Sequence, residues 1–281
     1  MTKYVYIDSN IFIQDNFSMG GEQLEEELTI CKYLGYELLC TDITQDEVTK
    51  VLTGKAAELK KLSNNLQKFN DWLNPDSEFS NFSSQCNDFS NSIIGDCSND
   101  IELFFKNKGF ITLKILELIE ANDIRAIMDD YFGQTGQFSN RSKPVEFNDA
   151  LQLKMIQGKV KVSDELIFVS GDQDFRKAIN AASLKVTALK SIKSFSESVS
   201  DLLQNTTPRH AESSVLEAIE EFNSDNEVYP TPGEIRLKLE SMTPEAPDNT
   251  KIDFLLSILK RRELINIDEK NGRISIRCKN G

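Results

Sequence analysis

Residues 166–172 read Leu-Ile-Phe-Val-Ser-Gly-Asp, an apolar run that leads through a small polar turn into a carboxylate. Residues 4–8, Tyr-Val-Tyr-Ile-Asp, lead in the same way into Asp8. Short apolar runs of this kind predict strands that are buried on both faces, as in a parallel sheet. Because ligands of open parallel sheets bind beyond the carboxyl ends of the strands, acids delivered to that edge favour a site for a cation.

The segments that flank these runs alternate between helix and strand patterns. Apolar periodicity predicts a helix over residues 22–34 that Gly35 ends, a strand over 36–40, and a helix from about Thr44. Later segments continue the alternation, with helices at 147–157, 174–182 and 195–203 and strands at 166–169 and 185–189. This order predicts a three-layer α/β/α fold around a central parallel sheet with right-handed crossovers.

A segment of about residues 62–125 lengthens the chain beyond this pattern. Residues 74–100 are dense in Ser, Asn and Asp, which predicts an insertion of loops and short helices. A long helix is predicted over residues 112–131, and residues 140–144 form a polar, basic loop.

The sequence divides after residues 204–208, Gln-Asn-Thr-Thr-Pro, which are typical of an interdomain linker. We therefore expect one domain at 1–205 and a second at 209–281. The second domain has helical patterns at 213–222, from 231, and at 250–261, then two short strands around Asn271-Gly272, a strong hairpin signal. This small α+β order of helix, helix, helix and hairpin resembles a winged helix-turn-helix.

Composition limits the chemistry that the chain can perform. No apolar run approaches the ~18 residues of a membrane span, and no signal-peptide pattern is present, so we expect a cytoplasmic protein with no membrane partner. Five scattered cysteines and the single histidine, His210, argue against a disulfide framework, a zinc site and a His-based triad. A net charge of −13 counts against broad binding to nucleic acid, but an acidic site is neutralised when cations load.

Two of the candidate acids have a competing structural explanation at a helix start. Asp8 precedes Ser9 and Asn10, which could orient it as a metal ligand, but an Asp at this place also caps a helix well. Glu47 follows Thr44 at the spacing of a capping box, although it also shares a helix face with apolar residues and could point into a cleft. The sequence leaves both explanations open for Asp8 and, for Glu47 taken alone, favours the capping box.

Three further acids lie at the starts of predicted helices. Asp149 lies where the helix dipole favours an anion, and it shares a face with apolar residues. Asp172 and Asp174 come directly after a buried strand, beside Gly171, which would let a ligand approach. The alternative is a capped turn between strand and helix. The sequence favours a ligand at Asp172 and leaves Asp149 open.

Taken in order, these motifs resemble the PIN domain, a nuclease family related to the flap nucleases. The matching pieces are Tyr6-Ile7-Asp8-Ser9-Asn10-Ile11-Phe12, Asp46-Glu47-Val48, Asn148-Asp149-Ala150 and Val169-Ser170-Gly171-Asp172-Gln173-Asp174-Phe175. The resemblance covers about residues 1–205, and its length and late Asn-Asp-Ala motif are most similar to a bacterial PIN-like branch. The 62–125 insertion and the winged-helix-like tail lie outside the family pattern.

The resemblance implies a nuclease site that holds one or two Mg²⁺ or Mn²⁺ ions. It assigns both catalysis and metal binding to Asp8, Glu47, Asp149 and Asp172. It assigns metal binding alone to Asp174, and a supporting role to Ser9, Asn10 and Asn148. Two ions ~3.5–4 Å apart can activate water and stabilise the leaving oxygen of a phosphodiester. No protein nucleophile is then required, which fits a chain without a Ser–His or Cys–His pair.

The expected substrate is nucleic acid, with single-stranded or structured RNA favoured over DNA. Candidate phosphate contacts are the basic residues near the acids in sequence, Arg141, Lys143, Arg176 and Lys177, although each could equally be a solvated surface charge. One alternative is a catalytically inactive PIN-like module that binds RNA or protein. Another is a DNA-structure nuclease. The complete set of acids favours an active nuclease.

Residues 209–281 contain 11 basic and 14 acidic residues, a net charge of −3. Lys260-Arg261-Arg262, Arg273 and Arg277 could still form a local basic face for nucleic acid. Apolar positions are numerous in this domain, so it could instead bind a protein partner or form a homo-oligomer.

Overall fold

The computed structural model describes residues 1–14, 22–70, 78–135, 138, 147–204, 210–226, 229–242, 249–268 and 272–276. The chain divides into two compact units, Met1–Phe195 and Ser196–Gly281. The boundary between them falls inside α9 (Ile192–Gln204). Residues 205–208 of the predicted linker lie outside the described residues.

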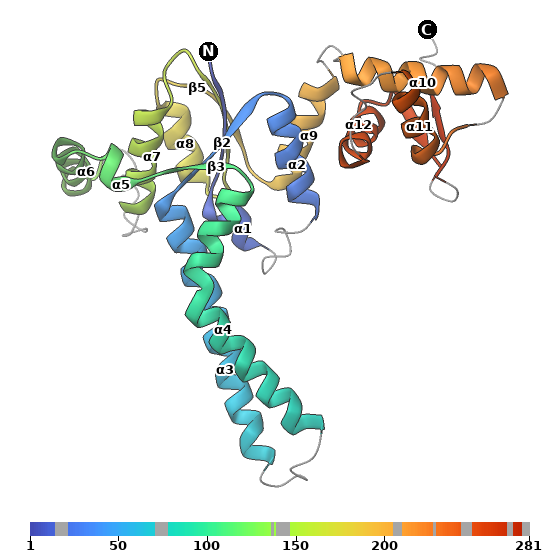
Figure 1. The fold of residues 1–281 in the computed structure, drawn as a ribbon. Coiled ribbons are helices and arrows are strands. Elements are labelled where there is room, and N and C mark those ends of the chain that lie inside the picture. The colour runs from blue at the N-terminus through green and yellow to red at the C-terminus, as the bar shows by residue number, and fades with distance from the viewer. Residues whose placement is uncertain are drawn as a thin grey trace. The chain divides into compact units, whose positions relative to one another are not determined.

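A five-stranded, all-parallel sheet organises the first unit (Figure 1). Its strands lie in the order β3–β2–β1–β4–β5, and their bounds are β1 Lys3–Ile7, β2 Tyr36–Thr41, β3 Phe110–Leu113, β4 Glu165–Val169 and β5 Lys185–Leu189. The predicted strands at 3–8, 36–40, 166–169 and 185–189 are confirmed. The prediction of one long helix over 112–131 is wrong, because it missed β3 and merged two short helices, α5 (Ile115–Leu118) and α6 (Ala121–Gly133).

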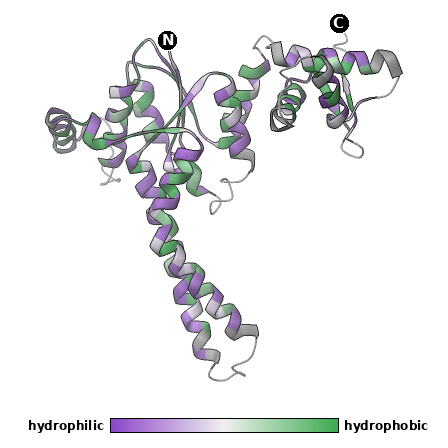
Figure 2. Cartoon of the chain, viewed as in Figure 1, coloured by the Kyte–Doolittle hydropathy of each residue, from purple (hydrophilic) through white to green (hydrophobic). Residues whose placement is uncertain are grey.

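Helices flank this sheet on both faces, which confirms the three-layer α/β/α arrangement. After β1 come the short α1 (Ser9–Ile13) and α2 (Glu22–Tyr33), and Gly35 ends the latter at a φ of 84°. In Figure 1, α2 covers one face of the sheet, while α7 (Phe147–Lys159) and α8 (Gln173–Ala181) cover the other. Figure 2 shows that the strands between these helices are largely hydrophobic.

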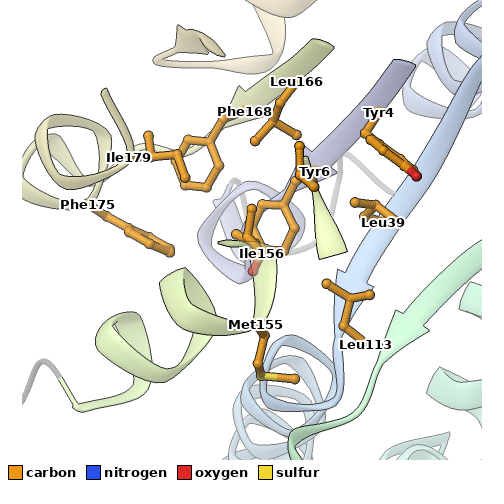
Figure 3. Close-up of a cluster of buried hydrophobic side chains, with 11 residues drawn as sticks. Tyr4, Tyr6, Leu39, Leu113, Met155, Ile156, Leu166, Phe168, Phe175 and Ile179 are labelled. Carbon is orange, nitrogen blue, oxygen red and sulfur yellow. The ribbon is translucent and has the colours of Figure 1, made fainter. Parts of the chain in front are cut away.

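The main core lies between the sheet and the pair α7 and α8 (Figure 3). The Tyr6 and Phe168 rings stack at 5.3 Å between centroids, and Phe175 meets Phe168 edge to face at 4.9 Å. Met155 and Ile156 of α7 are fully buried in the same cluster. Since Tyr6 and Phe168 lie two residues before Asp8 and Ser170, respectively, this core supports the sheet edge that carries the candidate acids.

The predicted insertion of loops and short helices over residues 74–100 is wrong for residues 78–100, and residues 74–77 lie outside the described residues. The described chain instead forms an antiparallel hairpin of two long helices, α3 (Asp42–Asn70) and α4 (Glu78–Asn107), which projects away from the sheet (Figure 1). At its base, Phe105 contacts Phe12 and Phe110 at ring-centroid distances of 5.0 and 5.1 Å. Although both helices are long, no described helix is apolar enough to cross a membrane.

The second unit has its own core and the predicted order of elements. Its described elements are α10 (His210–Asn226), α11 (Pro232–Met242), α12 (Asn249–Arg261), β6 (Ile265–Ile267) and β7 (Ile274–Ile276), with β6 and β7 antiparallel. Arg262 does not contribute to the predicted basic face, because its buried guanidinium donates to Glu212 at 3.0 Å. Arg277 lies outside the described residues.

Truncation of the stacked core should destabilise the first unit strongly. Phe168 is fully buried between Tyr6 and Phe175, so Phe168→Ala removes both ring contacts and leaves a cavity. We expect the free energy of unfolding in urea to fall by about 3–5 kcal/mol. Phe132→Ala on α6, where the ring is 73% exposed, is the matched control and should cost about 0.5 kcal/mol or less. Equal losses in the two variants would contradict this assignment of the core.

Candidate active site

Asp8 is a buried carboxylate at the end of β1 that is held by three close hydrogen-bond donors, with the Ser9 hydroxyl as a more distant fourth at 3.4 Å. Asp8 Oδ1 accepts from the Ser9 backbone N–H at 2.7 Å, and Asp8 Oδ2 accepts from the Asn10 amide at 2.5 Å and the Ser170 hydroxyl at 2.6 Å. Only 4% of the residue is exposed. Asp8 also takes the N-cap position of α1, so the structural explanation for this acid holds at the same time as its place in the site.

Parallel pairing of β1 and β4 brings these groups together. Ile7 is paired with Val169, and the Asp8 N–H donates to the Val169 carbonyl at 2.9 Å. The segments that follow β1 and β4 therefore leave the sheet side by side, with Asp8 next to Ser170. A further bond from the Gly171 N–H to Asn10 Oδ1 at 2.9 Å ties the two loops together.

Glu47 reaches the same place from α3. Its Oε2 accepts from the Ser9 hydroxyl at 2.6 Å, and its Oε1 accepts from the Asn148 amide at 2.7 Å. Ser9 thus lies between the Asp8 and Glu47 carboxylates, and Asn148 links the site to α7.

The capping-box explanation for Glu47 is wrong. Helix α3 begins at Asp42, two residues before the predicted start. Thr41 and Asp42 cap it, because Thr41 Oγ1 accepts from the Thr44 N–H at 3.0 Å and Asp42 Oδ1 accepts from the Ile43 N–H at 2.9 Å. Glu47 therefore lies beyond the first turn, and its carboxylate is directed to Ser9 and Asn148.

The electrostatics of the pair favour a positive charge. Burial raises the pKa of Asp8 to about 6, the hydrogen bond from Ser170 opposes this rise, and the negative charge of Glu47 adds to it. A carboxylate that burial and a neighbouring acid both destabilise gains most from a nearby cation.

Asp172 caps α8, as the structural explanation predicted. Its Oδ1 accepts from the N–H groups of Asp174 and Phe175 at 2.7 and 3.0 Å. Its own N–H donates to Ser170 Oγ at 3.0 Å. Because the same Ser170 hydroxyl donates to Asp8, it links Asp172 to Asp8. Asp174 lies further out, in an ion pair with Lys177 at 3.1 Å.

The remaining predicted residues differ in how closely the structure ties them to the site. Asp149 is half-buried in the first turn of α7, next to Asn148. Arg176 Nη1 donates to the Ser170 carbonyl at 2.5 Å, so part of its guanidinium fixes the β4–α8 turn. Arg141 and Lys143 lie outside the described residues.

Comparison with known proteins agrees with this arrangement. The family model of the PIN domain matches residues 5–175, which include the sheet edge, Glu47, Asn148, Asp149 and Asp172. This chain belongs to the PIN domain family. Proteins of this family are generally nucleases. No curated protein and no solved structure matches the chain.

The donors of this PIN domain fit a hard divalent cation, although few acids converge. Among the described residues, no three Asp, Glu, His or Cys side chains form a group that could hold a metal ion. Asp8 and Glu47 do come together, and their oxygen ligands suit Mg²⁺ and Mn²⁺. Mg²⁺ in proteins often uses only one or two carboxylates and completes its shell with water and substrate phosphate.

Sequence reasoning missed the central role of Ser170. This hydroxyl donates to Asp8 and accepts from the Asp172 N–H and, at 3.2 Å, from the Asn10 amide. Its place directly after β4, opposite Asp8, is a signal that could have found it. The space where Gly171 lacks a Cβ is occupied by protein side chains, because a Cβ there would meet Gln14 Nε2 at 2.8 Å and Asn10 Oδ1 at 3.3 Å.

A buried polar network beneath the PIN domain site was also missed. The Tyr6 hydroxyl donates to Gln152 Oε1 and lies 3.0 Å from Thr44 Oγ1, which itself lies 2.9 Å from Thr41 Oγ1. These bonds connect β1, α7 and the start of α3. They fix the elements that carry Asp8, Asn148 and Glu47.

The raised pKa of Asp8 predicts how its replacement should act on stability. The ionised carboxylate is costly to the folded state above about pH 6, and this cost shrinks as the pH falls toward the unfolded-state pKa of about 3.9. Asp8→Asn removes the titration. In EDTA, we expect its free energy of unfolding relative to wild type to rise by about 1 kcal/mol between about pH 5 and about pH 7.5.

Urea denaturation at both pH values measures this difference. The exposed Asp129 of α6 supplies the control, because Asp129→Asn should differ from wild type by the same amount at both pH values. A pH-independent difference for Asp8→Asn would contradict the raised pKa.

Proposed function

We propose that this chain is a divalent-metal-dependent nuclease that hydrolyses phosphodiester bonds, with RNA as its preferred substrate. The observation that carries the proposal is the buried Asp8 carboxylate held next to Glu47 at the carboxyl edge of a parallel sheet. Such a pair is costly without a cation, and membership of the PIN domain family gives that cation a catalytic purpose. The preference for RNA rests on the family.

Asp8 and Glu47 would hold Mg²⁺ or Mn²⁺. Asp149 and Asp172 are proposed as further ligands, with Asp174 in support. When bound, the ion supplies Lewis-acid polarisation of the phosphoryl oxygen and a more acidic water. We propose Lys177 and the free donors of Arg176 as phosphate contacts beside it.

The neighbouring residues position these acids. Ser9 donates to Glu47 and Asn148 donates to its other oxygen, so Glu47 is held at both carboxylate atoms. Asn10 and Ser170 both hold Asp8 Oδ2. This arrangement orients the two carboxylates before substrate arrives, which reduces the reorganisation that the reaction needs.

Cleavage assays test the proposal directly. Labelled single-stranded RNA, structured RNA and DNA are incubated with Mn²⁺ and the wild type, Asp8→Asn or Glu47→Gln. We expect cleavage, RNA faster than DNA, that EDTA abolishes and that each substitution slows by about a hundredfold or more, because each removes a ligand of a charge-stabilising ion.

The exposed Asp129→Asn variant is the control and should keep wild-type activity. Failure of the folded wild type to cleave any of these polymers would refute the nuclease and favour a PIN-like binding module. Faster cleavage of DNA would refute the substrate preference alone.

Asp172→Asn separates the two roles of that residue. Asn caps helices about as well as Asp, so α8 and the free energy of unfolding should change little. A ligand role depends on the negative charge, so we expect the cleavage rate to fall by about tenfold or more while stability is kept. Unchanged cleavage together with unchanged stability would leave Asp172 with a structural role only.

A further inference from the structure

The hairpin arm, defined as residues 50–70 of α3 and 78–103 of α4, packs through a seam of small side chains. The buried seam residues are Ala56, Ser63, Ser83, Ser90 and Cys97. Ser63 Oγ lies 2.9 Å from Ser83 Oγ and donates to the Ser83 carbonyl at 2.6 Å. Small side chains let the helices approach closely, but they bury little apolar area, and hydrophobic stabilisation scales with that area.

Large apolar side chains on α4 lie outside this seam. Phe82, Phe89 and Leu103 are 55%, 60% and 50% exposed. Their spacing, in multiples of seven, places them in one line along α4, and Phe82 and Phe89 directly precede the seam residues Ser83 and Ser90. A pair of helices needs only the narrow seam, whereas a wider apolar stripe is typical of a helix that packs in a larger bundle.

Opposite charges are segregated between the two helices of the arm. Residues 50–70 carry five lysines and one acid, a net charge of +4, whereas 78–103 carry five acids and no basic residue, a net charge of −5. Within the described part of the arm, no ion pair joins α3 to α4, since Lys55 pairs with Glu58 of its own helix and Lys60 donates to Asn91. Eight side chains that carry the prevailing charge of their helix are exposed on the surface of the arm: Lys50, Lys55, Lys61 and Lys68 on α3, and Asp88, Asp96, Asp100 and Glu102 on α4.

We propose that the hairpin arm is a dimerisation element that pairs with the arm of a second copy of this chain. Under two-fold symmetry, α4 of each copy faces α3 of the other, so that one acidic helix meets one basic helix at both contacts. The line of Phe82, Phe89 and Leu103 is covered at the same time. One symmetric arrangement thereby accounts for the wide apolar stripe, the weak seam and the divided charge.

The size of the arm is sufficient for such an interface. Two helices of about 10 Å diameter, roughly 32 Å and roughly 39 Å long over these segments, present a combined face of roughly 700 Å². Stable protein–protein interfaces bury about 800 Å² per partner. A second set of exposed apolar side chains, Leu116, Ile124 and Phe132 on α5 and α6, is not flanked by two oppositely charged helices of the arm's kind.

The first test measures the mass of the full-length chain in solution over a range of concentrations, by light scattering and sedimentation. We expect a concentration-dependent dimer for the wild type. Phe82→Glu combined with Phe89→Glu should raise the dimer dissociation constant by about tenfold or more, because both rings would lie at the centre of the interface. Since both rings are exposed, the helical content should be kept, and circular dichroism checks this.

Phe132→Glu on α6 is the matched control and should leave the dissociation constant unchanged. The proposal is overturned if the wild type stays monomeric up to its solubility limit. It is also overturned if the Phe82 and Phe89 substitutions leave the dimer intact, or if Phe132→Glu dissociates it.

The second test cancels all or most of the net charge of one helix at a time. One variant carries Lys61→Glu and Lys68→Glu on α3, and the other carries Asp96→Lys and Asp100→Lys on α4, all at exposed positions. Each variant alone should dimerise at least about tenfold more weakly, because each contact then pairs a charged helix with a nearly neutral one. An equimolar mixture should associate more tightly than either variant alone, because the heterodimer restores one contact between an unchanged basic α3 and an unchanged acidic α4, and high salt should weaken that recovery.

Recovery on mixing requires both variants to be folded, so it also excludes misfolding as the cause of weaker self-association. A mixture as weakly associated as its components would overturn the pairing of α3 with α4 between copies.

Discussion

A carboxylate buried at the end of a central strand must be compensated for its lost hydration, and the first unit is organised around that need. Asp8 obtains donors from Ser9, Asn10 and Ser170. Ser170 can serve only because β1 and β4 run parallel and end together, since an antiparallel β4 would carry it to the opposite sheet edge. Parallel pairing of these two strands is therefore a condition for the site as well as for the fold.

The sequence predicts the strand ends of this site well because their signal is local. An unbroken apolar run followed by an acid identifies both the buried strand and the residue that leaves it, as at Ile7–Asp8. Glu47 could not be assigned in this way, because Thr44 and Glu47 have the spacing of a capping box in either case. In the structure, Thr41 and Asp42 cap α3 before Thr44, so Glu47 is not part of a capping box. The start of α3 depends on where β2 ends, which the spacing of Thr44 and Glu47 does not show.

The hairpin arm escaped prediction for a different physical reason. Serine and asparagine are common in loops because their side chains compete with helical backbone bonds, and residues 74–100 are rich in both. In the arm, Ser63 and Ser83 bond across the two helices, and Ser90 bonds back to the Cys86 carbonyl at 2.7 Å. The seven-residue spacing of Ser83, Ser90 and Cys97 indicates one face of a helix. The residue types themselves favour loops, so they predicted the wrong structure.

A single helix, α3, carries both Glu47 and half of the arm, yet its two parts are held independently. Its first turn is tied to α5 by the bond from the Ile115 N–H to Asp42 Oδ2 at 2.9 Å, and to β1 and α7 through Thr44. These bonds fix the position of Glu47 from the sheet side, before the arm begins. Contacts further along the arm and contacts at the sheet edge share no residues, so their energies should add. A monomeric variant of the arm would therefore keep the geometry around Asp8.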